Sequence, residues 1–181
     1  MAKKKQKSAL GYICLALVAI CAIIAVVGAT QDWTVATFGG EVVKGSGSTL
    51  ENYKEAGDMA ADLGVEDNTS RTIAALGYLA VAAICVVAVA YVVKQLISLT
   101  LFRIIVILAG VATMAIGVAA IAYTASQISG MSTSTSDSIL GGLLEGITGG
   151  ATGISLGIGC YLTSIGAIAG GLFAAVGCFK K

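Results

Sequence analysis

Four long apolar runs constrain this chain more than any other feature, because each is long enough to cross a lipid bilayer. A helix that rises about 1.5 Å per residue needs about 20 residues to span about 30 Å of hydrocarbon. It also bonds its backbone polar groups within one segment, which hydrocarbon requires. The pattern predicts an all-α membrane protein, a four-transmembrane-helix bundle in a single integral membrane domain over residues 1–181. The predicted spans are residues 9–30, 72–93, 104–123 and 151–178.

The composition is typical of a chain that is surrounded by lipid. Hydrophobic residues make up 57% of the chain and charged residues only 12%, whereas a soluble domain carries about 25% charged residues. The predicted spans leave too few residues for a sizeable soluble core. We therefore expect the lipid bilayer as a partner and no nucleic acid.

The distribution of charge predicts how the chain is oriented. Segments 31–71 and 124–150 hold all ten acidic residues but only three of the eleven basic ones. Because Lys and Arg are enriched on the cytoplasmic side, we expect these two segments outside the plasma membrane and both termini in the cytoplasm. The other eight basic residues lie at the predicted inner ends of the spans: Lys3, Lys4, Lys5, Lys7, Lys94, Arg103, Lys180 and Lys181.

The start of the chain has an alternative interpretation as a cleaved signal peptide. Lys3–Lys7 would be its basic region, and Val27-Gly28-Ala29 resembles a small-residue cleavage site. The apolar run between them is longer than the usual length of about 7–15 residues, so we favour a retained first span.

The first outer segment predicts a β-hairpin followed by a helix. Residues 32–38 and 41–44 are rich in β-branched and aromatic side chains, and they flank Gly39-Gly40. Ser48-Thr49-Leu50-Glu51 then matches a capping box, with Ser48 as the cap of a helix over residues 49–63. We expect a small extracellular hairpin and an amphipathic helix that packs on it or on the bundle.

The predicted outer interaction surface combines aromatic residues of the hairpin with one charged face of this helix. We expect the Trp33 indole at the membrane interface rather than in a ligand site. The acidic side chains could hold a divalent cation, but they lack an Asp-x-Asp-x-Asp-Gly loop, so a solvated helix face is favoured. The surface comprises Trp33, Phe38, Glu51, Tyr53, Glu55, Asp58 and Asp62.

The second outer segment, 124–150, is rich in Ser, Thr and Gly. Ser132–Ser136 has low complexity and is expected to be mobile. Ile139–Ile147 is apolar and interrupted by Gly, which indicates an outer amphipathic or re-entrant piece.

Small residues recur every fourth position near the fourth span, which predicts close helix packing. Either this face self-associates into an oligomer, or it packs against the other helices of the same chain, which we favour. An oligomer could form a pore lined by the hydroxyls of Thr152, Ser155, Thr163 and Ser164. The packing glycines are Gly149, Gly153, Gly157, Gly166 and Gly170.

The chain shows no constellation that predicts catalysis. It has no His, and no nucleophile–base pair, phosphate loop or metal-ligand spacing is visible, so we expect no enzyme, cofactor or metal. No charged residue lies in the middle of a predicted span, which disfavours a proton-coupled transporter. All five Cys lie within predicted spans and are expected to pack as small apolar residues; palmitoylation of Cys178 at the inner boundary is the alternative.

The layout resembles the claudin and peripheral-myelin-protein superfamily. The resemblance covers the whole chain: four spans, both termini inside, a larger first outer segment with Trp33 and Gly39-Gly40, and a smaller second one. The superfamily's second outer Trp and paired outer Cys do not occur here. The resemblance implies a non-enzymatic protein whose outer segments contact a neighbour. We therefore expect a structural or interaction role, with an oligomeric channel lined by the glycine-rich fourth helix as the alternative.

Overall fold

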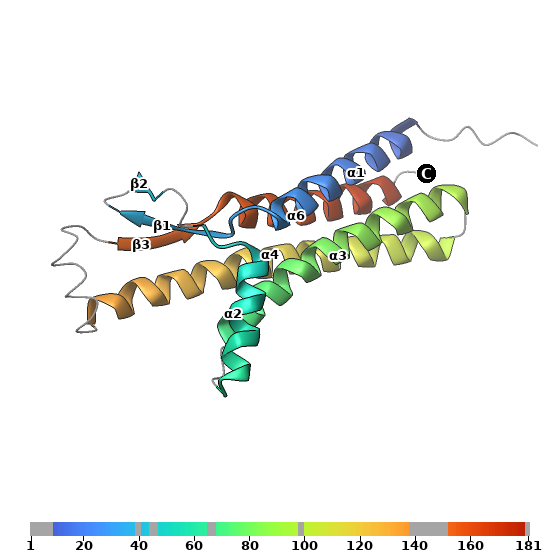
Figure 1. The fold of residues 1–181 in the computed structure, drawn as a ribbon. Coiled ribbons are helices and arrows are strands. Elements are labelled where there is room, and N and C mark those ends of the chain that lie inside the picture. The colour runs from blue at the N-terminus through green and yellow to red at the C-terminus, as the bar shows by residue number, and fades with distance from the viewer. Residues whose placement is uncertain are drawn as a thin grey trace, which may run out of the picture.

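Four long helices form the molecule, as the apolar runs predict. They are α1 (Ala9–Ala29), α3 (Asn68–Leu96), α4 (Thr100–Asp137) and α6 (Ile158–Phe179), all long and apolar enough to cross a membrane. Figure 1 shows them side by side in an elongated bundle. The structure is a computed structural model that describes residues 9–38, 41–43, 47–64, 68–97, 100–137 and 152–179. The four-helix part of the prediction is confirmed, and the chain has the build of a multi-pass membrane protein.

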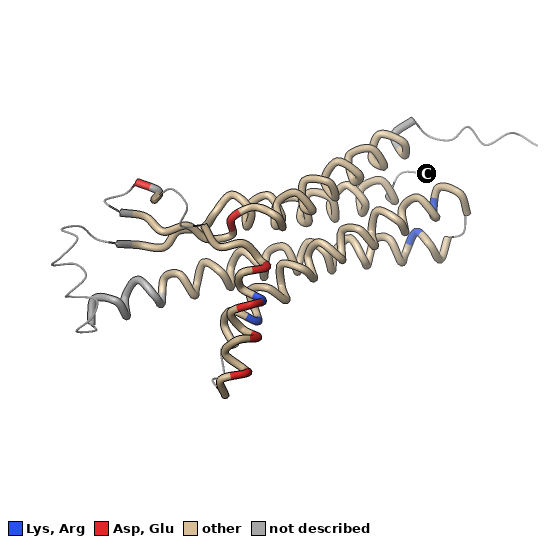
Figure 2. Tube along the Cα trace, viewed as in Figure 1, with Lys and Arg blue, Asp and Glu red and all other residues tan. Residues whose placement is uncertain are grey.

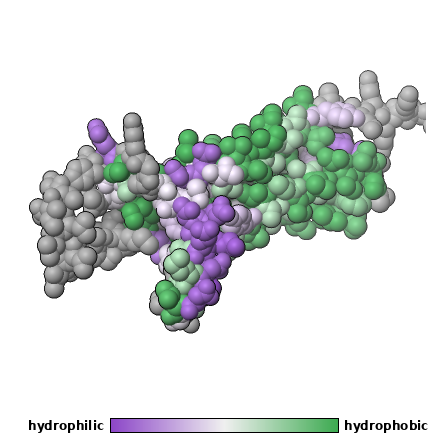
Figure 3. Space-filling model, viewed as in Figure 1, coloured by the Kyte–Doolittle hydropathy of each residue, from purple (hydrophilic) through white to green (hydrophobic). Residues whose placement is uncertain are grey.

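The interior of the bundle is narrow and its outer surface is apolar. Helix α6 packs against α1, α3 and α4, and its residues meet Val18 of α1, Ile84 and Tyr91 of α3, and Val106 of α4 in one buried cluster. Large apolar side chains also cover the outside of the bundle, where a soluble protein would carry charge (Figure 3). An apolar surface of this extent marks contact with lipid or with other proteins, and together with the length of the helices it is compatible with an integral membrane protein.

A small antiparallel sheet lies at one end of the bundle. It contains β1 (Thr34–Phe38), β2 (Glu41–Val42) and β3 (Thr152–Leu156) in the order β2-β1-β3. The β1–β2 pair confirms the predicted hairpin. Strand β3 corrects the predicted fourth span, because residues 152–156 pair with β1 from Thr34↔Leu156 to Phe38↔Thr152 and helix α6 begins only at Ile158. The predicted span was longer than the roughly 20 residues a bilayer needs, so its first part can pair outside the bundle.

Helix α2 (Leu50–Asp62) follows the sheet and projects sideways from the bundle (Figure 1). The predicted helix is confirmed, but its cap is Thr49: the Asn52 backbone N–H donates to the Thr49 hydroxyl at 3.4 Å. The prediction of Ser48 as cap is wrong because the Ser48 backbone is bonded to the start of β1. The Trp33 N–H donates to the Ser48 carbonyl at 2.8 Å, and the Ser48 N–H donates to the Thr34 carbonyl at 2.9 Å.

Helix α4 continues beyond the predicted third span, 104–123, as far as Asp137. The first part of the predicted outer segment 124–150 is therefore helical and includes Ser132–Ser136, whose mobility stays a prediction. Uninterrupted i to i−4 bonding carries the helix past the apolar run, since no Pro occurs to end it. Ile139–Ile147 lies outside the described residues.

Candidate functional site

The acidic end of the bundle, which carries α2 and the sheet, is built around a buried tryptophan. Trp33 is 0% exposed and belongs to an apolar cluster with Leu50, Ile73 and Cys160. A glycine of α3 makes room for it: a Cβ at Gly77 would lie 2.9 Å from Trp33 Cη2 and 2.6 Å from Leu50. The prediction that Trp33 belongs to an outer surface is wrong because these distant residues cover the indole, and its place at the level of the membrane interface stays a prediction. The sequence feature that could have predicted this contact is Gly77, the single Gly in the apolar helix α3.

The sheet is fastened to the start of α6 by backbone contacts at glycines. The Gly157 N–H donates to the Trp33 carbonyl at 2.7 Å, and the Gly159 N–H donates to the Asp32 carbonyl at 2.8 Å. Gly153 lies in β3, where the Thr37 hydroxyl donates to its carbonyl at 3.1 Å. The predicted helical stripe is therefore wrong for Gly153 and Gly157, because β1 captures this segment as a strand.

Gly166 and Gly170, by contrast, lie within α6 and face other helices of the same chain. A Cβ at Gly166 would lie 2.8 Å from the Cys21 carbonyl oxygen of α1, and one at Gly170 would lie 3.1 Å from Cys21 Cβ. These two glycines therefore serve close packing within one chain. Self-association stays a prediction, and Gly149 lies outside the described residues.

Two of the four residues proposed to line a pore, Thr163 and Ser164, are buried inside the single bundle, and the other two lie in β3. The Thr163 hydroxyl donates to the Ala25 carbonyl at 3.2 Å, and both Thr163 and Ser164 are fully buried. Ser155 pairs with Val35 in the sheet. The Thr152 backbone pairs with Phe38, and its side chain lies outside the description. The buried Thr163 and Ser164 do not line the outside of the single bundle, and an oligomeric pore stays a prediction.

Helix α2 is held by one side. Leu50 and Gly57 are buried, and a Cβ at Gly57 would lie 2.5 Å from Arg71 Cγ of α3. Tyr53 is half-buried, and its hydroxyl shares a hydrogen bond of 2.7 Å with the Thr34 hydroxyl of β1. Burial raises the pKa of Tyr53, although the bond to Thr34 opposes part of that shift. These contacts fix α2 to both the bundle and the sheet.

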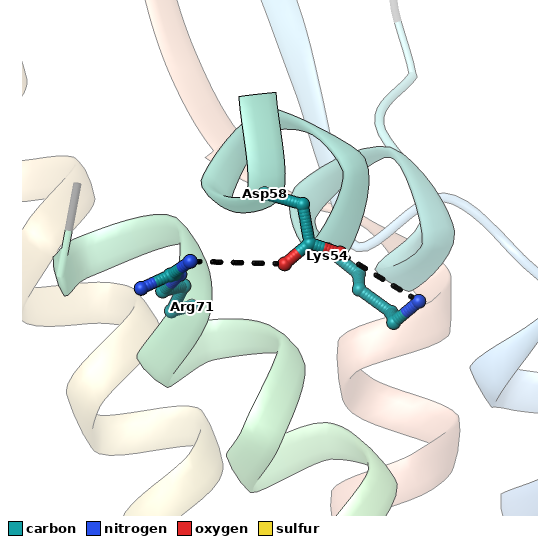
Figure 4. Close-up of polar contacts among 3 residues, drawn as sticks. All are labelled: Lys54, Asp58 and Arg71. Atoms are coloured by element: carbon teal, nitrogen blue, oxygen red, sulfur yellow. Dashed lines mark ion pairs between the residues drawn. The ribbon is translucent and has the colours of Figure 1, made fainter. Parts of the chain in front are cut away.

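The other side of α2 carries an acidic face, defined as Glu51, Glu55, Asp58 and Asp62, which are all exposed. Figure 2 shows acidic residues along this helix and Figure 3 shows its hydrophilic surface. Asp58 pairs with Lys54 at 3.7 Å and with Arg71 at 3.8 Å (Figure 4). Among the described residues no other member of this face has an ion pair. Exposed pairs of this kind contribute little stability, so the face stays available.

Two exposed apolar side chains border the acidic face near the end of α2. Met59 is 66% exposed and Leu63 is 75% exposed. Together with the acidic face they make a mixed apolar and charged surface. Phe38, the remaining residue of the predicted surface, pairs with Glu41 and Thr152 through its backbone, and its side chain lies outside the description.

No metal-binding group is found in the part of the chain that the structure describes. No group of three His, Cys, Asp or Glu side chains there could hold a metal ion. The five cysteines are free, and Cys178 is buried, which leaves its thiol no access to an acylating enzyme in this state.

The chain was compared with protein-family models, curated proteins and solved structures. No family model, no curated protein and no solved structure matches it. The resemblance to the claudin and peripheral-myelin-protein superfamily stays a prediction.

Proposed function

We propose that this chain is a non-enzymatic four-helix membrane protein that binds a protein partner through the acidic face of α2. The observation that carries the proposal is the contrast between the two sides of this helix. One side is anchored by Leu50, Gly57 and Tyr53, and the other side exposes four carboxylates and two apolar residues. The proposed orientation puts this face outside the cell, with the termini in the cytoplasm of a plasma-membrane protein.

The anchoring matters because it fixes the binding surface before a partner arrives. Ordering side chains and loops on association costs roughly 0.5–1.5 kcal/mol for each immobilised side chain. Helix α2 is already held by the Thr34–Tyr53 bond and by Leu50 in the Trp33 cluster. The helix projects sideways from the bundle (Figure 1), and its acidic residues are exposed, although Asp58 also reaches Arg71 of α3.

The chemistry of the surface indicates the class of partner. Glu51, Glu55 and Asp62 make no ion pair among the described residues, so a surface that carries Lys or Arg would complement them. Met59 and Leu63 would supply the apolar centre that a stable contact needs. We therefore propose a basic protein surface, on a neighbouring molecule or cell, as the partner.

Site-specific photocrosslinking from residue 59 in intact cells tests this proposal. We expect a discrete crosslinked product that is lost in a Glu51→Gln, Glu55→Gln, Asp62→Asn triple variant. Glu41→Gln is the matched control, because Glu41 is an exposed carboxylate on β2, away from α2, and should keep the product. A product that persists in the triple variant, or no product from residue 59 or residue 63, would contradict the proposal.

A further inference from the structure

Two cations converge on the C-terminal end of α6 at the basic end of the bundle, which lies opposite α2. Lys94 Nζ, from the last turn of α3, donates to the Gly177 carbonyl at 3.0 Å. Arg103 Nη2, from the first turn of α4, donates to the adjacent Cys178 carbonyl. The last carbonyls of a helix have no partner within the helix, so both cations cap α6 from outside.

The capping leaves most of the positive charge uncompensated. A helix C-terminus is equivalent to only about half a negative charge, whereas Lys94 and Arg103 bring two full positive charges. The Tyr91 ring, with its centroid 4.6 Å from Lys94 Nζ, adds a weak attraction. The described carboxylates lie away from this end, on α2 and around the sheet (Figure 2). Each cation also has further N–H groups to donate, since Lys carries three and Arg five.

The surroundings of the pair match the boundary between hydrocarbon and headgroups. Both cations are half-buried, and the nearby parts of α3 and α4 also expose large apolar residues to the outside of the bundle, among them Leu96, Leu101 and Leu108. A ligand that fits must therefore present a negative group beside a long apolar body. An anionic phospholipid has this form, with its phosphate at the level of the cations and its acyl chains against the apolar outer surface of the bundle.

We propose that Lys94 and Arg103 form a binding site for the headgroup phosphate of an anionic phospholipid, which joins α3, α4 and α6 at the basic end. The site is independent of the acidic face of α2 and of any partner that binds there. The lipid supplies the counter-charge that the described part of the chain does not place at this end. Anionic lipid is also the component that attracts basic segments to a membrane surface.

Native mass spectrometry of the full chain in neutral detergent tests the site with phosphatidylglycerol and phosphatidylcholine of the same acyl chains. We expect phosphatidylglycerol to bind more tightly than phosphatidylcholine. Removing one cation should weaken phosphatidylglycerol binding about five-fold, and a Lys94→Gln, Arg103→Gln double variant should lose about twenty-five-fold. The matched control is Lys54→Gln, Arg71→Gln, which removes the same two charge types near α2 and should bind as the unmodified chain does.

Equal binding of the two lipids, an unchanged double variant, or an equal loss in the control would overturn the proposal. Inorganic phosphate should not stabilise the protein against heat; stabilisation equal to that by the lipid would show a site for free anions instead. If the double variant does not fold, Lys94→Arg and Arg103→Lys keep the charges and should keep the preference. Ionic strength near 1 M, where charges are screened beyond about 3 Å, should then remove that preference in the unmodified chain. A preference that survives the added salt would also contradict the site.

Discussion

The two ends of the bundle are closed by different chemistry. At the acidic end, Trp33 and Leu50 bury apolar surface where β1, α2, α3 and α6 meet. At the basic end, Lys94 and Arg103 hold the last carbonyls of α6 by charged hydrogen bonds. The acidic end holds together segments that are far apart in sequence. Burial of apolar side chains can do this because, unlike a hydrogen bond, it does not depend on the direction of a donor. The basic end joins α6 to the short α3–α4 turn by these two directed bonds, in addition to the burial of Tyr91 with Cys14 of α1 and Cys178 of α6.

The comparison predicts the largest loss of stability for Trp33→Ala. Removing a fully buried Trp should lower the free energy of unfolding by about 3–5 kcal/mol, because it leaves a cavity among Leu50, Ile73 and Cys160. Denaturation in mixed detergent micelles measures the change. Trp33→Phe should lose much less, since Trp33 Nε1 has no hydrogen-bond partner among the described residues. Equal losses of stability in Trp33→Ala and Trp33→Phe would contradict the claim that burial of a large apolar side chain stabilises the acidic end.

Arg103→Gln should cost less, about 1.5–3 kcal/mol, because it removes one charged hydrogen bond to the Cys178 carbonyl. The same denaturation experiment provides the measurement. Arg71→Gln is the control, since Arg71 makes an exposed ion pair near α2 and should change little. A loss as large as that of Trp33→Ala would mean that the basic end, not the acidic end, dominates stability.

Gly166→Val should destabilise the monomer by about 1–3 kcal/mol, because its side chain would collide with the backbone of α1 at Cys21. Ile165→Val, on the neighbouring residue that is 57% exposed, is the control and should be nearly neutral. Detergent-corrected mass and stability are measured together. A variant that loses an oligomer while the monomer keeps its stability would instead support the self-association hypothesis.

Tyr53→Phe should lower stability by about 0.5–1.5 kcal/mol near neutral pH, through loss of the bond to Thr34. Burial raises the pKa of the Tyr53 phenol from 10.0 in the unmodified chain, so the folded state favours the neutral phenol. The contribution is complete below the unfolded pKa of about 10 and falls as pH rises through the higher folded pKa. The free energy of unfolding, measured at pH 8 and about pH 11, should fall less between these two pH values in Tyr53→Phe than in the unmodified chain. An identical alkaline loss would show that Tyr53 is not responsible.

Asp58→Asn should have the smallest effect on stability, below about 0.5 kcal/mol, since both of its ion pairs are exposed and longer than 3.5 Å. Thermal denaturation checks this value, with Asn52→Ala on the same helix as a further exposed control. A large loss would mean that α2 is held by charge rather than by Leu50, Gly57 and Tyr53. The acidic face would then be structural instead of a free contact surface.

The sequence predicts the bundle well because membrane-spanning helices are a local property of hydropathy. The four apolar runs, the hairpin and helix α2 each need only neighbouring residues, and the structure confirms them. Strand β3 was missed because Thr152–Leu156 is apolar enough to read as part of a span, and only β1 makes it a strand. More than 100 residues separate β3 from β1, so neighbouring residues do not predict this strand pairing. The only sequence feature that suggested it was the length of the predicted fourth span, which exceeds the roughly 20 residues that a bilayer needs.

The candidate site shows the same division between local and distant contacts. The charged side of α2 follows from helical periodicity, so Glu51, Glu55, Asp58 and Asp62 were placed correctly. Trp33 was not, because its burial depends on Leu50 and on the space at Gly77. Glycine spacing predicted close approach at Gly166 and Gly170 but could not name the partner, which is α1 of the same chain for both and α3 as well at Gly170.

Labelling of introduced cysteines in intact cells tests most directly whether the bundle crosses the membrane between its acidic and basic ends. Asp62→Cys on α2 and Leu96→Cys at the end of α3 are both exposed, and the unmodified chain provides the background. With a membrane-impermeant maleimide, the account predicts immediate labelling at residue 62 and labelling at residue 96 only after permeabilisation. Labelling of both residues before permeabilisation, or of residue 96 alone, would contradict it.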